Sequence, residues 1–219
     1  MRACLDEVPA VVLRPCAVIG DSSSGRTRTF NVIYYPLKLL SRGLLRVLPG
    51  SARTPIDLVP VDYVADAANH IMLRADCTGK TYHLTAGPGA VTIGTIARLA
   101  VKHLNASRGS GDPAVAPVRF IPHWVFQALL KPALKAMYGA RGSEVMARLE
   151  VYLPYLTKRK HFDTTNAIEA LRGTGIAPPD LESYFGRVVR YCRETDWGRS
   201  PGDAASLAGG ASAGRASLD

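Results

Sequence analysis

The residues best placed to bind a ligand follow a short apolar run near the start of the chain. Ala10–Leu13 is apolar and mostly β-branched, and Arg14 and Pro15 come directly after it. In an open parallel sheet, ligands bind beyond the carboxyl ends of the strands. A proline at such an end removes a backbone donor and fixes the chain direction, so the next backbone groups are free to contact a planar amide. An ordinary exit from a strand into a loop would have the same pattern.

Tyr34 and Lys38 are four residues apart, which is the spacing of a proton-transfer pair on one face of a helix. Pro36 lies between them, and a helix tolerates proline only in its first turn. We therefore expect Tyr34 to be a core or pocket aromatic residue. The serines at 22–24 lie outside any G-x-S-x-G elbow, so the sequence does not predict nucleophilic hydrolysis.

The histidines and cysteines lack the spacing of a metal site. None of the five histidines forms an H-x-x-x-H pair and none of the four cysteines forms a C-x-x-C pair. Separate cysteines are typical of a reducing compartment, which predicts a cytoplasmic location. The net charge is +9, but Lys and Arg are scattered along the chain. Scattered charge favours a solvated basic surface, or a phosphate-bearing ligand such as a dinucleotide or a coenzyme A thioester, over nucleic acid.

The elements that would position these residues alternate between strand and helix, which predicts an α/β fold. Apolar periodicity, capping residues and Gly/Pro punctuation predict a strand at 10–13, a loop at 20–28, a helix at 30–48, an extended segment at 55–61, a helix at 63–74 capped by Asp62, a strand at 80–85 and a helix at 92–104. Residues 105–117 are expected to form a flexible linker. Mostly helical structure is expected at 118–160, 162–172 and 181–197, with a disordered tail at 199–219.

Two segments together resemble the extended short-chain dehydrogenases/reductases. The first is Arg14-Pro15 with Gly20 five residues on, and the second is Val59-Pro60-Val61-Asp62-Tyr63-Val64-Ala65. Within that superfamily, the loop at 20–25 resembles the thioester reductase and fatty acyl-CoA reductase branch. Phe162-Asp163-Thr164-Thr165-Asn166, with Leu171, is similar to the C-terminal region of fatty acyl reductases. The resemblance covers residues 1–105 well and residues 106–197 loosely.

The resemblance implies the later strands and helices of a Rossmann-like parallel sheet at 1–105, followed at 106–198 by a mainly helical substrate-binding part. It implies an oxidoreductase that uses NADP or NAD to reduce an acyl thioester or another lipid-like carbonyl. The nicotinamide would be bound by Pro15, Cys16, Ala17 and Val18. The substrate would be bound by Gly20, Asp21, Ser22, Ser23 and Gly25, while Asp62 would cap its own helix.

Two functional parts of that family do not occur in this sequence. No G-x-G-x-x-G turn is present, and the family's Tyr/Lys pair is expected upstream of Met1. We therefore expect no catalytic residue here and a fragment that is inactive alone. Either a partner chain supplies the N-terminal half, or the chain is a truncated gene product, or its start is mis-assigned. Without that half, the edge of the interior strand at 10–13 would be exposed.

Three alternatives remain open at the level of sequence. The chain could be a non-catalytic acyl- or lipid-binding module, or could resemble a sugar epimerase or a hydroxysteroid dehydrogenase. The apolar segments 30–48 and 120–138 favour a lipid over a sugar. Residues 120–138 are expected to pack in the core or to cover the substrate, with peripheral contact to a membrane surface as the other interpretation.

Overall fold

The computed structural model describes residues 10–30, 33–109, 113–132 and 162–198. Most of the helical region expected at 118–160 and the tail at 199–219 lie outside these residues. Strands and helices alternate along the described chain, and three of its four strand pairs are parallel. The predicted α/β class is confirmed.

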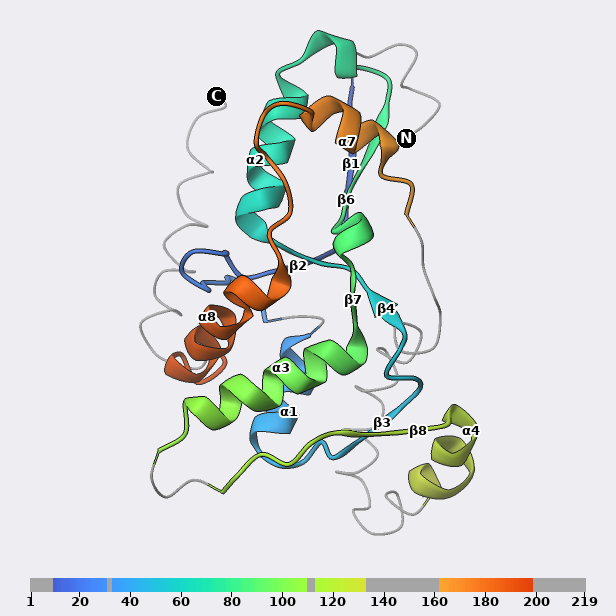
Figure 1. Ribbon diagram of the computed structural model, residues 1–219, viewed down its shortest axis with the longest axis vertical. Helices are drawn as coiled ribbons and strands as arrows, with labels where there is room; N and C mark the ends of the chain where they lie inside the picture. The colour runs from blue at the N-terminus through green and yellow to red at the C-terminus, as the bar shows by residue number, and fades with distance from the viewer. Residues whose placement is uncertain (1–9, 31–32, 110–112, 133–161, 199–219) are drawn as a thin grey trace, which may run out of the picture.

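A parallel pair of strands lies in the upper half of the molecule as Figure 1 draws it. β1 (Val12–Pro15) pairs with β6 (Thr81–Leu84), with Pro15 opposite Leu84. Helices α2 (Val61–Met72) and α7 (Thr165–Leu171) pack beside the pair. Burial of apolar side chains is the main force that holds these elements together. The core between them is made by Val59, Tyr63, Ala67, Ile71, Cys77, Tyr82, Leu84, Ala167, Ala170 and Leu171.

β1 is a strand, as predicted, but it begins two residues later than expected and is not deeply buried. Val12 and Leu13 are half-buried, whereas Arg14 and Pro15 are exposed. Within the described part of the chain, β1 forms a sheet with β6 alone. β1 therefore has an open edge within the described residues, as expected for this strand without an N-terminal half. An apolar, β-branched run favours a strand, but its depth depends on neighbours that the run does not encode.

The remaining strand pairs lie lower in the molecule as Figure 1 draws it, together with several helices. The pairs are β2 (Ala17–Ile19) with β5 (Leu58–Pro60), parallel; β3 (Val47–Pro49) with β8 (Arg119–Ile121), parallel; and β4 (Pro55–Ile56) with β7 (Val91–Thr92), antiparallel. The helices are α1 (Tyr34–Ser41), α3 (Ile93–Ala106) and α8 (Leu181–Glu194), which bury one large apolar cluster between them.

The start of α3 and the two late helices follow the sequence signals. The Thr92 side chain accepts a hydrogen bond from the backbone N–H of Thr95, which confirms the predicted helix start. At α7, the Asp163 carboxylate accepts from the backbone N–H of Thr165. α8 buries one face, made by Leu181, Tyr184, Phe185, Val188, Val189 and Cys192, and it ends three residues before the predicted limit.

The single helix predicted at 30–48 is wrong, because α1 ends at Ser41. Gly43 adopts a left-handed conformation with φ of 69°, and its N–H donates to the carbonyl of Leu40. The N–H of Leu44 donates to the carbonyl of Leu39. Such bonds close a helix at a glycine, and the chain then turns into β3. The Leu-rich run continues the apolar pattern through that turn, because Leu45 is also buried.

The segment between α3 and the second half of the chain is partly fixed. The Asn105 side chain donates to the carbonyl of Val115 and accepts from its N–H, at 3.0 and 2.9 Å, so the predicted linker is anchored at that point. β8, a one-turn α4 (His123–Val125) and a short π-helix (Phe126–Leu130) follow. Phe126 is buried, but Trp124 is 70% exposed and Leu129 is 65% exposed. The prediction of core packing is therefore wrong for Trp124 and Leu129.

Two 3₁₀ turns complete the described elements, at Ala75–Cys77 and Gly87–Gly89. They lie at opposite ends of β6, the first shortly before the strand and the second shortly after it. Among the described helices, none has both the length and the apolar composition needed to span a lipid bilayer.

Candidate functional site

The predicted cofactor-binding run lies where the chain passes from one strand pair to the next. The N–H of Cys16 donates to the carbonyl of Leu84 at the carboxyl end of β6, at 3.2 Å. Ala17 then begins β2, which pairs with β5. Pro15 is exposed, and Cys16, Ala17 and Val18 are half-buried. The run is thus a partly open, largely apolar surface at the carboxyl ends of β1 and β6, which is where an α/β sheet binds ligands.

Cys16 is a neutral thiol in this setting. Burial, with the nearby Asp57 charge as the second cause, raises the pKa of Cys16 to about 12. Asp57 lies between β4 and β5, and its carboxylate accepts from the N–H of Ala86 at 2.9 Å. A cysteine whose pKa is raised is a poor nucleophile at neutral pH, because only the thiolate reacts. The surface around Cys16 therefore suits non-covalent contact with a ring or an amide.

The predicted substrate loop, residues 20–25, is organised around one carboxylate. Asp21 Oδ1 accepts hydrogen bonds from the backbone N–H groups of Ser23 and Ser24, at 3.0 and 2.7 Å, and from both hydroxyls. The carbonyl of Asp21 accepts from the N–H of Gly25, and its N–H donates to the carbonyl of Arg26. This local bonding makes residues 21–26 a closed turn.

Asp62 holds this loop and does not cap its own helix, which corrects the sequence prediction. α2 begins at Val61, after an extended Pro60 with φ of −78° and ψ of 155°. The Asp62 carboxylate accepts from the backbone N–H of Ser22 at 2.9 Å and from the Ser22 hydroxyl. The helix starts two residues earlier than the Asp62 signal implied, which places this carboxylate in the first turn and turns it toward the loop. A negative charge there also suits the helix dipole.

A second clamp on Ser22 comes from the far end of the sequence. Nε of Arg187, on α8, donates to the carbonyl of Ser22 at 2.8 Å. Gly25 lies directly against the same helix: its φ is 75°, and a Cβ there would be 2.3 Å from the carbonyl oxygen of Arg187. Gly20 is equally confined, since a Cβ would be 2.4 Å from the carbonyl oxygen of Gly25. Sequence reasoning singled out the loop but missed Arg187, because no local signal links positions 165 residues apart.

Tyr34 and Lys38 do lie on one helix, α1, with Pro36 in its first turn. The Tyr34 hydroxyl is buried in the core and accepts the N–H of Gly20 at 2.7 Å. Burial raises the pKa of Tyr34 to about 12, the opposite of what a proton-transfer tyrosine requires. Tyr34 therefore anchors the start of the loop at 20–25, and this geometry gives it no access to a ligand.

For two buried tyrosines near the loop, removal of the hydroxyl should change the stability of the protein differently. Tyr34→Phe leaves the buried N–H of Gly20 without its acceptor, and we expect the free energy of unfolding to fall by about 1–3 kcal/mol. The Tyr184 hydroxyl is buried and has no partner among the described residues. Tyr184→Phe should therefore leave stability unchanged or raise it by up to about 1 kcal/mol. Urea unfolding of both variants measures this, and equal losses would contradict it.

The Asp21 turn should make stability depend on acidic pH. Hydrogen bonds from the side chain of Ser23, and then from Ser24, lower the pKa of Asp21 from 3.8 to about 2. The resulting stabilisation is fully present above the unfolded pKa and is lost as pH falls from about 4 towards 2. Asp21→Asn should remove that dependence. Since the turn is solvent-accessible, we expect a difference of only about 1 kcal/mol at neutral pH. Thermal unfolding of both proteins at pH 2, 3, 4 and 7 checks this.

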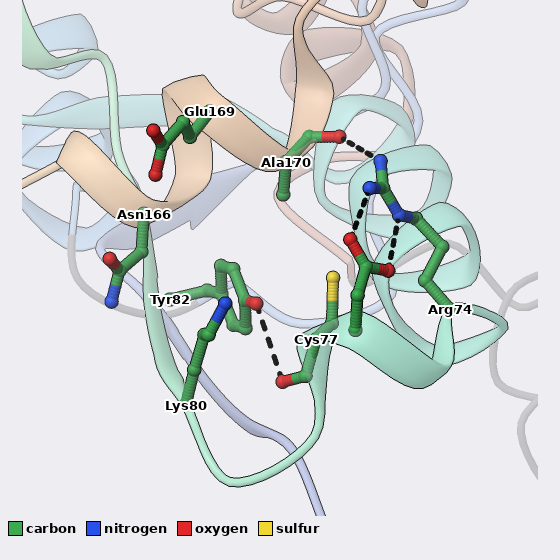
Figure 2. Close-up of a pocket in the computed structure, with 8 residues that line it drawn as sticks. Arg74, Cys77, Lys80, Tyr82, Asn166, Glu169 and Ala170 are labelled. Carbon is green, nitrogen blue, oxygen red and sulfur yellow. Dashed lines mark hydrogen bonds and ion pairs between the residues drawn. The ribbon is translucent and has the colours of Figure 1, made fainter.

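A cavity of about 260 Å³ lies at the opposite, amino end of β6 (Figure 2). Arg74 forms a two-point ion pair with Asp76 across its mouth and donates to the carbonyl of Ala170 at 3.0 Å. The Tyr82 hydroxyl donates to the carbonyl of Cys77 at 3.3 Å. These groups join the turn after α2 to α7. Because they bond to one another, the cavity is better explained as a structural joint than as a ligand site.

This chain is similar to a known family in sequence and to known proteins in structure. Residues 1–68 match the model of a family described as "Male sterility protein", a segment that includes β1, the loop at 20–25 and Asp62. The chain is similar in structure to the terminal R domain of the myxalamid PKS-NRPS biosynthetic pathway, with a TM-score of 0.66 and 24% identity, over 91% of this chain and 48% of that one. No curated protein matches the chain in sequence.

Two sugar-nucleotide enzymes have the same fold. UDP-glucuronic acid 4-epimerase from Bacillus cereus, solved with UDP-glucuronic acid and NAD, has a TM-score of 0.54 and 15% identity over 86% of this chain and 46% of its own. dTDP-glucose 4,6-dehydratase from Streptomyces venezuelae, solved with NAD, has a TM-score of 0.54 and 16% identity, with coverages of 90% and 48%. The chain spans about half the length of each of these three structures.

The fold is similar to the Rossmann-like α/β folds of short-chain dehydrogenase/reductase enzymes. Within that class, the match at residues 1–68 and the likeness to the R domain confirm the predicted resemblance to the thioester reductase and fatty acyl-CoA reductase branch.

Proposed function

We propose that this chain forms the nicotinamide-facing and substrate-facing part of an NAD(P)-dependent oxidoreductase that reduces an acyl thioester or another lipid-like carbonyl. The observation that carries the proposal is the clamped loop. Residues 20–25 are held by Asp62 and Arg187, and follow directly on the Cys16 surface at the carboxyl ends of β1 and β6. Both features lie inside the segment that matches the male sterility family.

The Cys16 surface fits a nicotinamide ring. Pro15, Cys16, Ala17 and Val18 expose mainly apolar atoms, and the Cys16 thiol stays neutral beside the Asp57 charge. The cofactor would supply the hydride, and these residues would orient its ring and exclude water. The substrate would lie over Asp21, Ser22 and Ser23, which Asp62 keeps in a fixed conformation, while Gly20 and Gly25 are buried and let the loop pack closely on its neighbours.

The proton donor for such a reduction would come from another polypeptide segment. The hydroxyls of Ser22, Ser23 and Ser24 donate to carboxylates, and the Tyr34 hydroxyl is buried. The sequence has no G-x-G-x-x-G turn to bind a dinucleotide diphosphate. We therefore infer that this chain is inactive by itself and acts with a partner that supplies the turn and the Tyr/Lys pair. The half-exposed β1 offers an edge for such a partner.

Two further properties follow the same proposal. Three cysteines among the described residues, Cys16, Cys77 and Cys192, are free thiols, which suits the cytoplasm. Trp124 and Leu129 expose apolar surface, which suits contact with a lipid-like substrate or with the surface of a membrane.

The proposal predicts nicotinamide binding that can be blocked at β1. In saturation-transfer NMR with NADP, we expect the nicotinamide protons to receive more saturation from the protein than the adenine protons. Pro15→Trp should abolish this transfer, because a bulky ring would cover the exposed end of β1. Pro88→Trp is the control, since Pro88 is an exposed proline in the turn after β6. Equal transfer in all three proteins would overturn the nicotinamide assignment.

An absorbance assay at the reduced-nicotinamide band, with long-chain acyl-CoA, tests the chemistry. We expect no oxidation by this chain alone, and oxidation when a polypeptide carrying the glycine-rich turn and Tyr/Lys pair is added. Turnover by this chain alone would overturn the requirement for a partner. Saturable binding of acyl-CoA without any binding of NADP would instead support a non-catalytic acyl-binding module and overturn the reductase proposal.

A further inference from the structure

A second cavity, of about 310 Å³, lies between the C-terminal ends of α1, α3 and α8. It is distinct from the clamped loop, because Arg193 on its wall is six residues further along α8 than Arg187, roughly 9 Å at the helical rise. Its lining residues are Ser41, Arg42, Leu104, Arg108, Pro113, Val115, Arg193, Asp196 and Trp197.

The charge of this cavity is positive. Three guanidinium groups, of Arg42, Arg108 and Arg193, line it together with a single carboxylate, Asp196. Arg193 is fixed, because its Nη1 donates to the carbonyl of Leu104 at 3.2 Å and to the Ser107 hydroxyl at 3.1 Å. In the described part of the chain, the side chains of Arg42 and Arg108 have no hydrogen-bond or ion-pair partner. Clustered, unpaired cations at a concave surface favour an anion.

The remaining walls are apolar and firmly held. Leu104 and Val115 are buried, and Val115 is bonded through both backbone groups to the Asn105 side chain. Trp197 is half-buried and packs against the main core cluster. Its φ is 59°, a conformation that is unfavourable for a bulky residue, and its N–H donates to the carbonyl of Cys192 at 2.7 Å. The fold thus holds an indole at the wall at some cost in backbone strain.

We propose that this cavity binds a phosphate-bearing small molecule with an aromatic or apolar body, of the chemical class of a nucleotide. The planar guanidinium groups of Arg42 and Arg108 bind the phosphate oxygens, as arginine forks do. Trp197, Leu104 and Val115 contact the body of the ligand. The proposal does not depend on the reductase activity, because it concerns a different cavity and needs no turnover.

The chain offers a direct optical test. It has two tryptophans, so Trp124→Phe leaves Trp197 as the single indole fluorophore. In that background the full chain is titrated with ADP, inorganic phosphate and adenosine. We expect ADP to change the Trp197 emission with saturation, and its Kd to be at least about tenfold lower than that of phosphate or adenosine, because only ADP engages both walls. Added salt should weaken the binding of ADP.

Variants locate the binding. Arg42→Gln with Arg108→Gln should raise the Kd for ADP at least about tenfold, because two charge-assisted contacts are lost. Arg172→Gln, at an exposed arginine after α7, should leave it unchanged. Far-UV circular dichroism confirms that each variant is folded. An unchanged emission with ADP, an equal loss of affinity in Arg172→Gln, or adenosine binding as tightly as ADP would each overturn the proposal.

Discussion

Gly25→Ala is expected to lower the free energy of unfolding by about 3 kcal/mol or more, the largest effect of any single methyl group in the candidate site. Two costs combine at this position. The φ of 75° is unfavourable for alanine, and the new Cβ would be 2.3 Å from the carbonyl oxygen of Arg187. That oxygen belongs to the backbone of α8, so relief requires the whole loop to move away from the helix. Urea-induced unfolding, followed by circular dichroism, measures the change.

Gly43→Ala is the matched control for this variant. Gly43 has a similar φ, 69°, but nothing lies within 4 Å of the position its Cβ would take. It should lose only about 1 kcal/mol, the cost of the left-handed backbone alone. The difference between the two variants therefore reports the contact between the loop and α8. Equal losses would mean that the loop at 20–25 is not packed against Arg187.

Local signals predicted those parts of the fold that depend on near neighbours. Thr92 caps α3, and Asp163 bonds to Thr165 at the start of α7, because each interaction spans two or three residues. The helix predicted at 30–48 ends early for a local reason: Gly43 adopts the left-handed conformation that ends a helix. At this position the glycine signal prevails over the leucines that continue the apolar pattern.

The depth of β1 and the role of Asp62 could not be predicted from nearby residues. Asp62 has the sequence pattern of a cap, yet its carboxylate bonds to Ser22, forty positions earlier in the chain. Which donor a carboxylate meets depends on how α2 is docked on the loop, and that docking is set by tertiary packing. Tertiary packing also places Arg187 against Ser22. It likewise brings Arg42, Arg108 and Arg193 to one cavity from three separate helices or their ends.

Asp62→Ala is expected to lower the free energy of unfolding by about 2 kcal/mol and to loosen the loop at 20–25 specifically. The carboxylate accepts two hydrogen bonds from Ser22, and bonds to a charged acceptor are stronger than neutral ones. Without the carboxylate, the Ser22 carbonyl still accepts a hydrogen bond from Arg187, but the Ser22 N–H has lost its acceptor. Hydrogen exchange measured by mass spectrometry should therefore show faster exchange in the peptide that contains Ser22, with α3 unaffected.

Asp66→Ala separates this effect from the general loss of a negative charge on α2. Asp66 lies one turn further along the same helix and is exposed, so its removal should change stability by less than about 0.5 kcal/mol and leave exchange in the loop unchanged. If both variants behaved alike, the charge at the start of α2 would matter only through the helix dipole. The loop would then be shaped by Asp21 and α8 alone, and its conformation would no longer depend on the helix that follows β5.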